Sequence, residues 1–324
     1  MYLRLGAIVF SALASVASAQ GTAEPNYPSR PIRMIAPSSA GGPVDVIARV
    51  VSQGLGEVLG QQVVVDNRAG AAGMIGAELV ANGSPDGYTL MFGFSGPLAI
   101  APQLAAKRPY DATKDFAPIS LVSQGQYVLL VRPSLPVSSI RELVAMARAQ
   151  PGKLNYASGG NGTGIHLAGE LLKLTAGVNI VHVPYKGAGP GMTALLANEV
   201  DLMFNGLPPA LPHVKSGKLK GLAVAGAKRS PLLPEMPTVR EGGVDFNTAG
   251  WYGILAPPKT SRAIVMRVHA ATMKVLATPS VSENLTRQGV EVIGSTPEEF
   301  AKILREEWSK TEKVIKAAGL KGQG

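Results

Sequence analysis

The sequence predicts an α/β protein of two similar lobes, each built on a mostly parallel sheet flanked by helices. Apolar, strand-like runs alternate with amphipathic helical stretches through most of the chain, which is the pattern of strand–helix–strand units. This series occurs twice, and 324 residues are more than one hydrophobic core usually organises. We expect the first lobe to comprise residues 27–124 and 248–324, and the second to comprise residues 125–247.

The first series opens with a short strand and a long amphipathic helix. Ile47, Val51 and Leu55 recur at helical spacing and form one apolar stripe. Asp86-Gly87 is a turn signal before the last strand of the series. The elements expected here are strands at 33–36, 62–66 and 89–92 and helices at 44–59 and 75–81.

The second series and the final segment continue the alternation. A Pro- and Gly-rich stretch at 230–248 predicts a surface segment that returns to the first lobe. Thr296-Pro297 followed by Glu299 predicts a helix start, because it supplies a cap, a proline at N1 and a glutamate at N3. We expect strands at 128–132, 154–157, 180–183, 200–204, 219–225, 290–293 and from 251, and helices at 139–149, 165–176, 192–197, 264–276 and from 297.

Residues 1–19 predict a secretory signal peptide. Arg4 gives a basic start, residues 5–16 are apolar, and Ala17-Ser18-Ala19 is a small-residue cleavage site. About a dozen apolar residues are too few to cross a hydrocarbon core, which needs about 20. We therefore expect export, with cleavage after Ala19 and Gln20 as the first mature residue.

Composition excludes several classes of protein. The chain has no cysteine, which rules out thiolate nucleophiles, disulfides and cysteine-based metal sites. The four histidines include no pair at i, i+4 and no HExxH, so we expect no catalytic metal and no cofactor. The formal charge is +9, or +8 without Arg4, but the cations are dispersed and only 5% of residues are aromatic. We expect no nucleic-acid partner; a basic body suits anionic solutes.

A glycine-rich turn at residues 36–45 joins the first strand to the first helix. Its free backbone N–H groups and the positive end of the helix would cradle an anion at the carboxyl edge of the sheet. Asp45 has two interpretations: it stabilises the start of the helix or it lies at the ligand, where it would repel an anion. The candidate binding residues of this turn are Ser38, Ser39, Gly41, Gly42, Val44 and Asp45.

A second turn, at residues 157–166, has the same position between strand and helix and the same chemistry. Two such turns in successive lobes would face each other across a cleft and bind one ligand from both sides. For His166, a hydrogen bond at the helix start is as consistent with the pattern as a ligand contact. The candidates of this turn are Ser158, Gly160, Asn161, Gly162, Thr163 and His166.

Further polar residues follow predicted strands, where ligands of open parallel sheets bind. These are Asn67, Ser95, Tyr185 and Asn205, with Arg68 and Lys186 as possible counter-ions. The second turn lacks GxGxxG spacing and the chain lacks GxxxxGK[ST], which argues against a nucleotide site. An exported α/β hydrolase using Ser158 or His166 stays an alternative, although no GxSxG elbow is present.

Over residues 27–320 the chain resembles the Bug receptors, the extracytoplasmic solute-binding proteins of tripartite tricarboxylate transporters. The resemblance rests on several motifs together: Pro37 with GGPVD at 41–45, VDNRAGAAG at 65–73, PDGYTL at 85–90, PYD at 109–111, DFAP at 115–118, LNYAS at 154–158, HVPYKG at 182–187 and KRSP at 228–231. It implies a periplasmic-binding-protein type II-like fold whose lobes close on a small carboxylate, and no catalysis. It also implies a periplasmic location and membrane permease subunits as partners.

The resemblance places ligand contacts in residues 38–45 and 158–166, at Ser95 and at Asn205. Three departures bear on the ligand. The family usually has an aromatic residue where this chain has Ser38, Thr or Ser where it has Val44, and often Asp where it has Asn205. The first opens space, the second removes a hydroxyl and the third removes a negative charge. Our hypothesis is therefore a bulkier or partly apolar acid, for example an aromatic carboxylate. A receptor that signals to a sensor protein stays a further alternative, and a monomer is the simplest expectation.

Overall fold

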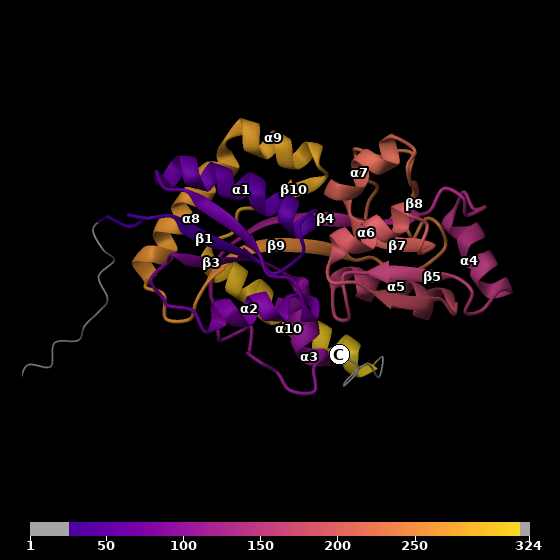
Figure 1. The fold of residues 1–324 in the computed structure, drawn as a ribbon, viewed down its shortest axis with the longest axis horizontal. Helices are drawn as coiled ribbons and strands as arrows, with labels where there is room; N and C mark the ends of the chain where they lie inside the picture. The colour runs from indigo at the N-terminus through magenta and orange to yellow at the C-terminus, as the bar shows by residue number, and fades with distance from the viewer. Residues whose placement is uncertain (1–25, 318–324) are drawn as a thin grey trace, which may run out of the picture.

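The computed structural model describes residues 26–317, and these form two lobes that lie side by side (Figure 1). The predicted signal segment, residues 1–19, lies outside the described residues. The strands form one continuous sheet in the order β2-β1-β3-β9-β4-β7-β5-β6, with β10 and β8 paired to β4. The two lobes are therefore joined through one sheet.

Lobe one holds a parallel group of strands, β2-β1-β3, extended by antiparallel neighbours. Its strands are β1 (Ile32–Ala36), β2 (Val63–Asn67), β3 (Thr89–Phe94), β9 (Ala249–Ala256) and β10 (Val290–Val292). Its helices are α1 (Pro43–Leu59), α2 (Met74–Ala81), α3 (Ala101–Leu104), α8 (Arg262–Ala277), α9 (Pro279–Arg287) and α10 (Pro297–Ala317), with single turns η1 (Ala71–Gly73) and η2 (Gly96–Ile100).

Lobe two repeats this plan with β5 as the central parallel strand, between β6 and β7. Its strands are β5 (Asn155–Ser158), β6 (Val181–Pro184), β7 (Leu202–Gly206) and β8 (Lys220–Val224). Its helices are α4 (Ile140–Ala149), α5 (Gly164–Ala176), α6 (Ala188–Leu196) and α7 (Leu207–Lys215). Its own core is continuous and includes the large buried side chains of Tyr156 and Phe204.

The long strand β4 (Ala117–Val131) runs through both lobes. Up to Gln126 it pairs with β9 of lobe one, and from Tyr127 it pairs with β7 of lobe two. A second crossing lies beside it, because the Tyr127 carbonyl accepts a hydrogen bond from Ala225 N–H and the Ala225 carbonyl accepts one from Thr248 N–H, both at 2.7 Å. The pairing partner of β4 thus changes from β9 to β7 between Gln126 and Tyr127. The lobe limits at 125 and 247 stay a prediction.

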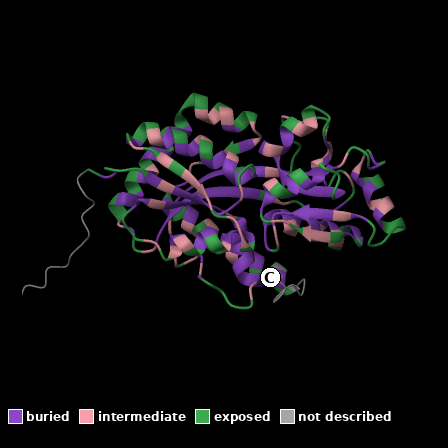
Figure 2. Ribbon diagram, in the orientation of Figure 1, coloured by how far each residue is buried: buried purple, intermediate pink, exposed green. Residues whose placement is uncertain are grey.

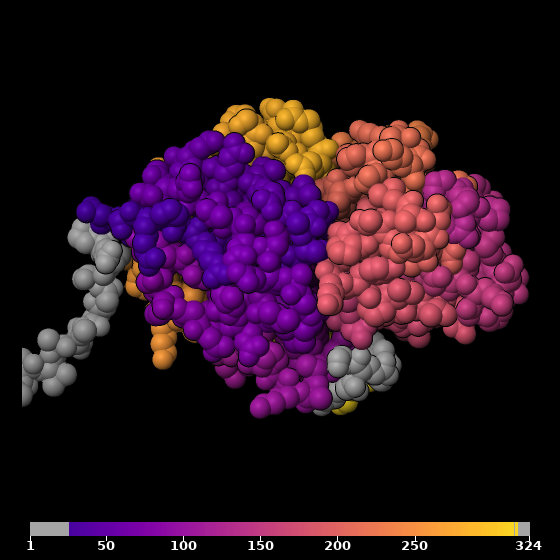
Figure 3. All heavy atoms as spheres, in the orientation of Figure 1, coloured from indigo at the N-terminus to yellow at the C-terminus, as the bar shows by residue number. Residues whose placement is uncertain are grey.

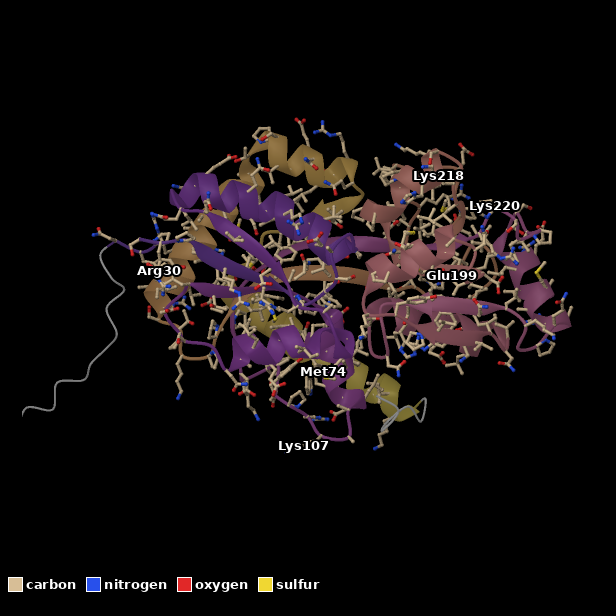
Figure 4. All side chains as sticks on the ribbon, in the orientation of Figure 1. Arg30, Met74, Lys107, Glu199, Lys218 and Lys220 are labelled. Atoms are coloured by element: carbon tan, nitrogen blue, oxygen red, sulfur yellow. The ribbon has the colours of Figure 1, made fainter. Side chains whose placement is uncertain are left out.

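The sheet is buried on both faces, and the helices that cover it are exposed on their outer sides (Figure 2). In lobe one the stripe of Ile47, Val51 and Leu55 is fully buried, as the helical spacing predicts. Most charged side chains lie on the outside of both lobes, as the labelled Lys107 and Lys218 illustrate in Figure 4, whereas Asp45 and Asp201 are buried. The basic character of the chain is thus a surface property.

The α/β class and the two-lobed arrangement agree with the prediction, and the differences concern particular elements. The sheet is mixed, because β4 and β9 run antiparallel to their neighbours where they cross between lobes. Sequence patterns did not predict helices α7 and α9. Helix α7 begins with Leu207-Pro208-Pro209, and α9 has a single buried residue, Leu285, and therefore no apolar stripe. The first half of β4 was missed because it carries Pro118 and buried serines.

Candidate functional site

A cavity lies between the two lobes, where the loops after the parallel strands of both lobes meet. Space-filling atoms of lobe one and lobe two abut along this boundary (Figure 3). The cavity has a volume of about 40 Å³. It is lined by Pro37, Ser38, Pro43, Val44, Ala69, Gly70, Ala72, Gly73, Phe94, Tyr127, Gly159, Thr163, Gly164, Ile165, Gly187, Ala188 and Tyr252.

Three helices, α1, α5 and α6, point their N-termini at this cavity. The lining includes Val44 of α1, Gly164 and Ile165 of α5, and Ala188 of α6. Amides in the first turn of a helix have no acceptor within the helix, and the helix dipole makes this end positive. No charged side chain lines the cavity within residues 26–317. An anion bound here would therefore be held by backbone N–H groups and hydroxyls.

Aromatic side chains form the rest of the wall. Phe94 ends β3, Tyr127 lies in β4 at the change of sheet, and Tyr252 comes from β9. Burial raises the pKa of Tyr127 to about 12 and holds the pKa of Tyr252 well above its usual value. Both phenols are therefore neutral at ordinary pH and can donate a hydrogen bond.

The predicted residues of the first turn separate into two groups. Ser38 and Val44 line the cavity, whereas Ser39, Gly41 and Gly42 do not. Gly41 has φ +74°, a conformation that favours glycine, and its N–H donates to Asp45 Oδ2 at 3.0 Å. The turn is thus closed on itself by Asp45.

Asp45 is buried and forms an ion pair with Arg49, whose Nη2 lies 2.9 Å from Asp45 Oδ1. Burial raises the pKa of Asp45, but the bonds from Arg49, Gly41 and Asn67 outweigh it and lower the pKa overall. The structure therefore shows Asp45 as an ionised support of the turn. Asn67 also supports the turn, because its side-chain amide donates a hydrogen bond to the Ser38 carbonyl at 3.2 Å.

The second turn is organised by a buried cluster behind it. Ser158 Oγ lies 2.6 Å from His182 Nε2 and accepts the N–H of Gly160 at 3.0 Å. Gly162 N–H donates to His166 Nδ1 at 3.2 Å, and the rings of His166 and His182 are in contact at a tilt of 31°, with centroids 4.3 Å apart. Burial lowers the pKa of both histidines, that of His182 to about 4. Both rings are therefore neutral supports of the turn.

The other candidates lie at different distances from the cavity. Thr163 lines it and caps α5, with its hydroxyl oxygen 3.3 Å from His166 N. Ser95 and Asn205 are buried near the crossing strands but outside the lining. Asn161 is exposed and Tyr185 is half-buried, and neither lines the cavity.

The contact between Ser158 and His182 resembles that between the nucleophile and the general base of a hydrolase. The geometry around Ser158 therefore bears on the hydrolase alternative. Ser158 is fully buried and lies outside the cavity lining, and a bond from Gly160 N–H already occupies its hydroxyl oxygen.

No cluster of three potential metal ligands occurs within residues 26–317. None of the helices in this range has the length and apolar character to span a bilayer.

Sequence reasoning missed part of the wall: Phe94, Tyr127, Tyr252 and the segments 69–73 and 187–188. Phe94 ends strand β3 and segment 187–188 follows strand β6, so the rule of strand ends could have found them. Tyr127 and Tyr252 lie inside strands that cross between lobes, and their position depends on how the two lobes meet.

Comparisons with known proteins agree with this geometry. Residues 47–320 match the model of the tripartite tricarboxylate transporter family receptors. The chain is 39% identical over 291 residues to a protein from the tcbD–tcbE intergenic region of Pseudomonas sp. strain P51, covering 89% of this chain and 86% of that one.

Solved structures show the same fold. The periplasmic binding protein BugD is 34% identical, with a TM-score of 0.88, and the match covers 91% of this chain and 99% of that one. Rpa4515 of R. palustris, solved with adipate, is 35% identical, with a TM-score of 0.87 and coverage of 90% and 98%. BugD is thus a periplasmic binding protein, and the family is one of receptors, which are binding proteins and not enzymes. The chain belongs to the family of tripartite tricarboxylate transporter receptors.

Proposed function

We propose that this receptor captures a small acid with one carboxylate and an apolar body, for example an aromatic carboxylate, between its lobes. The observation that carries the proposal is the cavity itself, which combines three helix N-termini with a neutral, largely apolar wall. Helix N-termini favour a carboxylate, and the amides need no counter-ion to hold it. Phe94, Tyr127 and Tyr252 would contact the body of the ligand.

The two departures in the first turn support this choice. Ser38 and Val44 both line the cavity, so each can affect what fits there. A small side chain at Ser38 leaves room that an aromatic residue would fill. Val44 presents methyl groups instead of a hydroxyl, which suits an apolar part of the ligand.

A second candidate is an aliphatic dicarboxylate. The similar receptor Rpa4515 was solved with adipate, which is the observation in favour. Against it, no charged side chain lines this cavity within the described residues, so a second carboxylate would need its own set of amides or hydroxyls.

Calorimetry of the purified protein with benzoate and with adipate separates the two candidates. We expect benzoate to bind more tightly, and Ser38→Tyr to weaken benzoate binding more than about tenfold because the ring occupies the same space. Ser280→Tyr, on exposed α9, is the matched control and should bind like the wild type. Binding of adipate alone, or equal benzoate affinity in both variants, would contradict the proposal.

We also propose that the receptor is exported, cleaved after Ala19, and delivers its ligand as a monomer to the membrane subunits of a tripartite tricarboxylate transporter. Lobe one, residues 27–124 and 248–324, would close on lobe two about the crossing of β4 and β9. Intact-mass measurement of the exported protein should show Gln20 as its first residue. A ligand-dependent pull-down should recover permease subunits; recovery of a sensor protein instead would favour signalling.

A further inference from the structure

Helix α6 lacks an N-terminal cap of its own. Its N-cap residue is Gly187, which has no side chain to accept a hydrogen bond from the first turn. Helices α4, α5 and α8, by contrast, are capped by Ser139, Thr163 and Ser261 from their own segments. An N-cap side chain normally accepts the amide of the second or third helical residue. In α6 that amide needs another partner.

The partner comes from the opposite lobe. Gly189 N–H, at the second position of α6, donates to Ser39 Oγ at 3.3 Å. The fit around this bond is close: a Cβ on Gly187 would overlap the Ser39 side chain, and a Cβ on Gly189 would overlap the Ala40 carbonyl. Ser39 therefore occupies the place of an N-cap side chain for a helix that belongs to lobe two.

Ser39 does not line the cavity, whereas Gly187 and Ala188 do. Ser39 thus contacts the end of α6 that is available to a ligand, without contacting the space that a ligand would fill. The two partners lie in different lobes, joined by the crossing strands, so the bond forms only when the lobes meet.

We propose that Ser39 is a positioning residue that stabilises the closed receptor by capping α6 across the cleft. The proposal rests on the proposed capture of a carboxylate between the lobes. Loss of the hydroxyl removes a contact of the closed form only, so the closed population falls and every ligand dissociates faster. Because the hydroxyl does not contact the ligand, all ligands should weaken by the same factor.

The size of the effect follows from the nature of the bond. Replacing a serine N-cap by alanine commonly costs the equivalent of a 2- to 30-fold change in an equilibrium constant. The bond from Gly189 is long and Ser39 is half-buried, which places it at the low end. We expect about a threefold change.

A cross-linking experiment tests closure without any ligand. The chain has no cysteine, so Ala40→Cys with Pro190→Cys, both at exposed positions on the two sides of the contact, gives one reactive pair. The rate of linkage by a short bis-maleimide measures how often the lobes meet. We expect Ser39→Ala to slow linkage about threefold and Ser39→Thr, which keeps the hydroxyl, to restore it.

Ser139→Ala is the matched control, because it removes an N-cap whose oxygen lies 3.2 Å from Glu142 N within lobe two. It should lower the melting temperature but leave linkage unchanged. Equal linkage rates in Ser39→Ala and its parent would overturn the proposal. So would calorimetry in which Ser39→Ala weakens adipate and benzoate by different factors. Failure of both acids to bind the wild type would refute the proposed ligand class instead, while linkage still decides the role of Ser39.

Discussion

Replacement of Gly162 by alanine should hinder closure of the lobes, an effect separate from the backbone strain that it adds within lobe two. Gly162 lies in the second turn, with φ +85°, and packs against α3 of lobe one. A Cβ there would lie 2.8 Å from Ala101 Cα and 2.9 Å from Ala101 Cβ, closer than ordinary contacts of at least 3.4 Å. The obstacle is backbone and a methyl group, which cannot rotate away. The lobes must therefore part by roughly half an ångström at this point.

Gly177→Ala gives a control that separates this clash from backbone strain. Gly177 ends the same helix, α5, with φ +62°, and a Cβ there would meet nothing within 4 Å. Both substitutions place alanine in the left-handed region, which costs about 1 kcal/mol and lowers the melting temperature by about 2–4 °C in a protein of this size.

Only Gly162→Ala should also lose ligand affinity. Parting of the lobes weakens the contacts that complete the cavity, and the loss of one or two hydrogen bonds corresponds to about tenfold in Kd. Calorimetry with benzoate and adipate measures the affinity, and thermal melting measures the shared strain. Equal affinities of Gly162→Ala and Gly177→Ala would refute the inference that the lobes close against Ala101.

Two further predictions concern stability. The pKa of His182 is lowered to about 4 by burial, whereas an unfolded histidine titrates near 6.5, so stability should fall as the pH drops from about 6.5 to 4. His182→Gln, whose side chain can still bond Ser158, should make the melting temperature less dependent on pH over this window. An unchanged slope of melting temperature against pH would contradict this prediction. Asp201 accepts bonds from Arg132 Nε at 2.8 Å and Asn155 N–H at 2.9 Å, so Asp201→Ala should lose about 3 kcal/mol in urea unfolding at pH 7. A loss below about 1 kcal/mol would show that the ion pair of Asp201 and Arg132 contributes little to the free energy of unfolding.

Local patterns were sufficient to predict the elements that carry strong local signals. Helix α1 begins one residue before its expected start, and the cap at Thr296 is present, with Glu299 N 3.2 Å from the Thr296 hydroxyl. Helix α7 was missed because prolines at its first turn read as breakers, although proline is compatible with that position. In α7, therefore, the signal that failed was one whose meaning depends on position within a helix.

The site shows the same division between local and non-local information. Strand-to-helix turns could be located from sequence, and Ser38, Val44 and Thr163 do line the cavity. What the sequence could not show is which face of a turn meets the other lobe. Ser39 follows Ser38 directly, yet one hydroxyl borders the cavity and the other bonds α6. That difference depends on how two separate chain segments pack together.

We expect closure, and not charge, to determine which acids the receptor selects. The dispersed cations lie on the outside, so they can raise the rate of encounter with anions in a salt-dependent way but cannot distinguish one acid from another. Discrimination must then come from how far the lobes approach around the ligand. Glycines set that limit: Gly162 meets Ala101 and Gly187 meets Ser39 with no room for a methyl group. An acid too large for the lobes to reach this limit is excluded, whereas acids that fit within it let the lobes close to the same degree and keep both contacts.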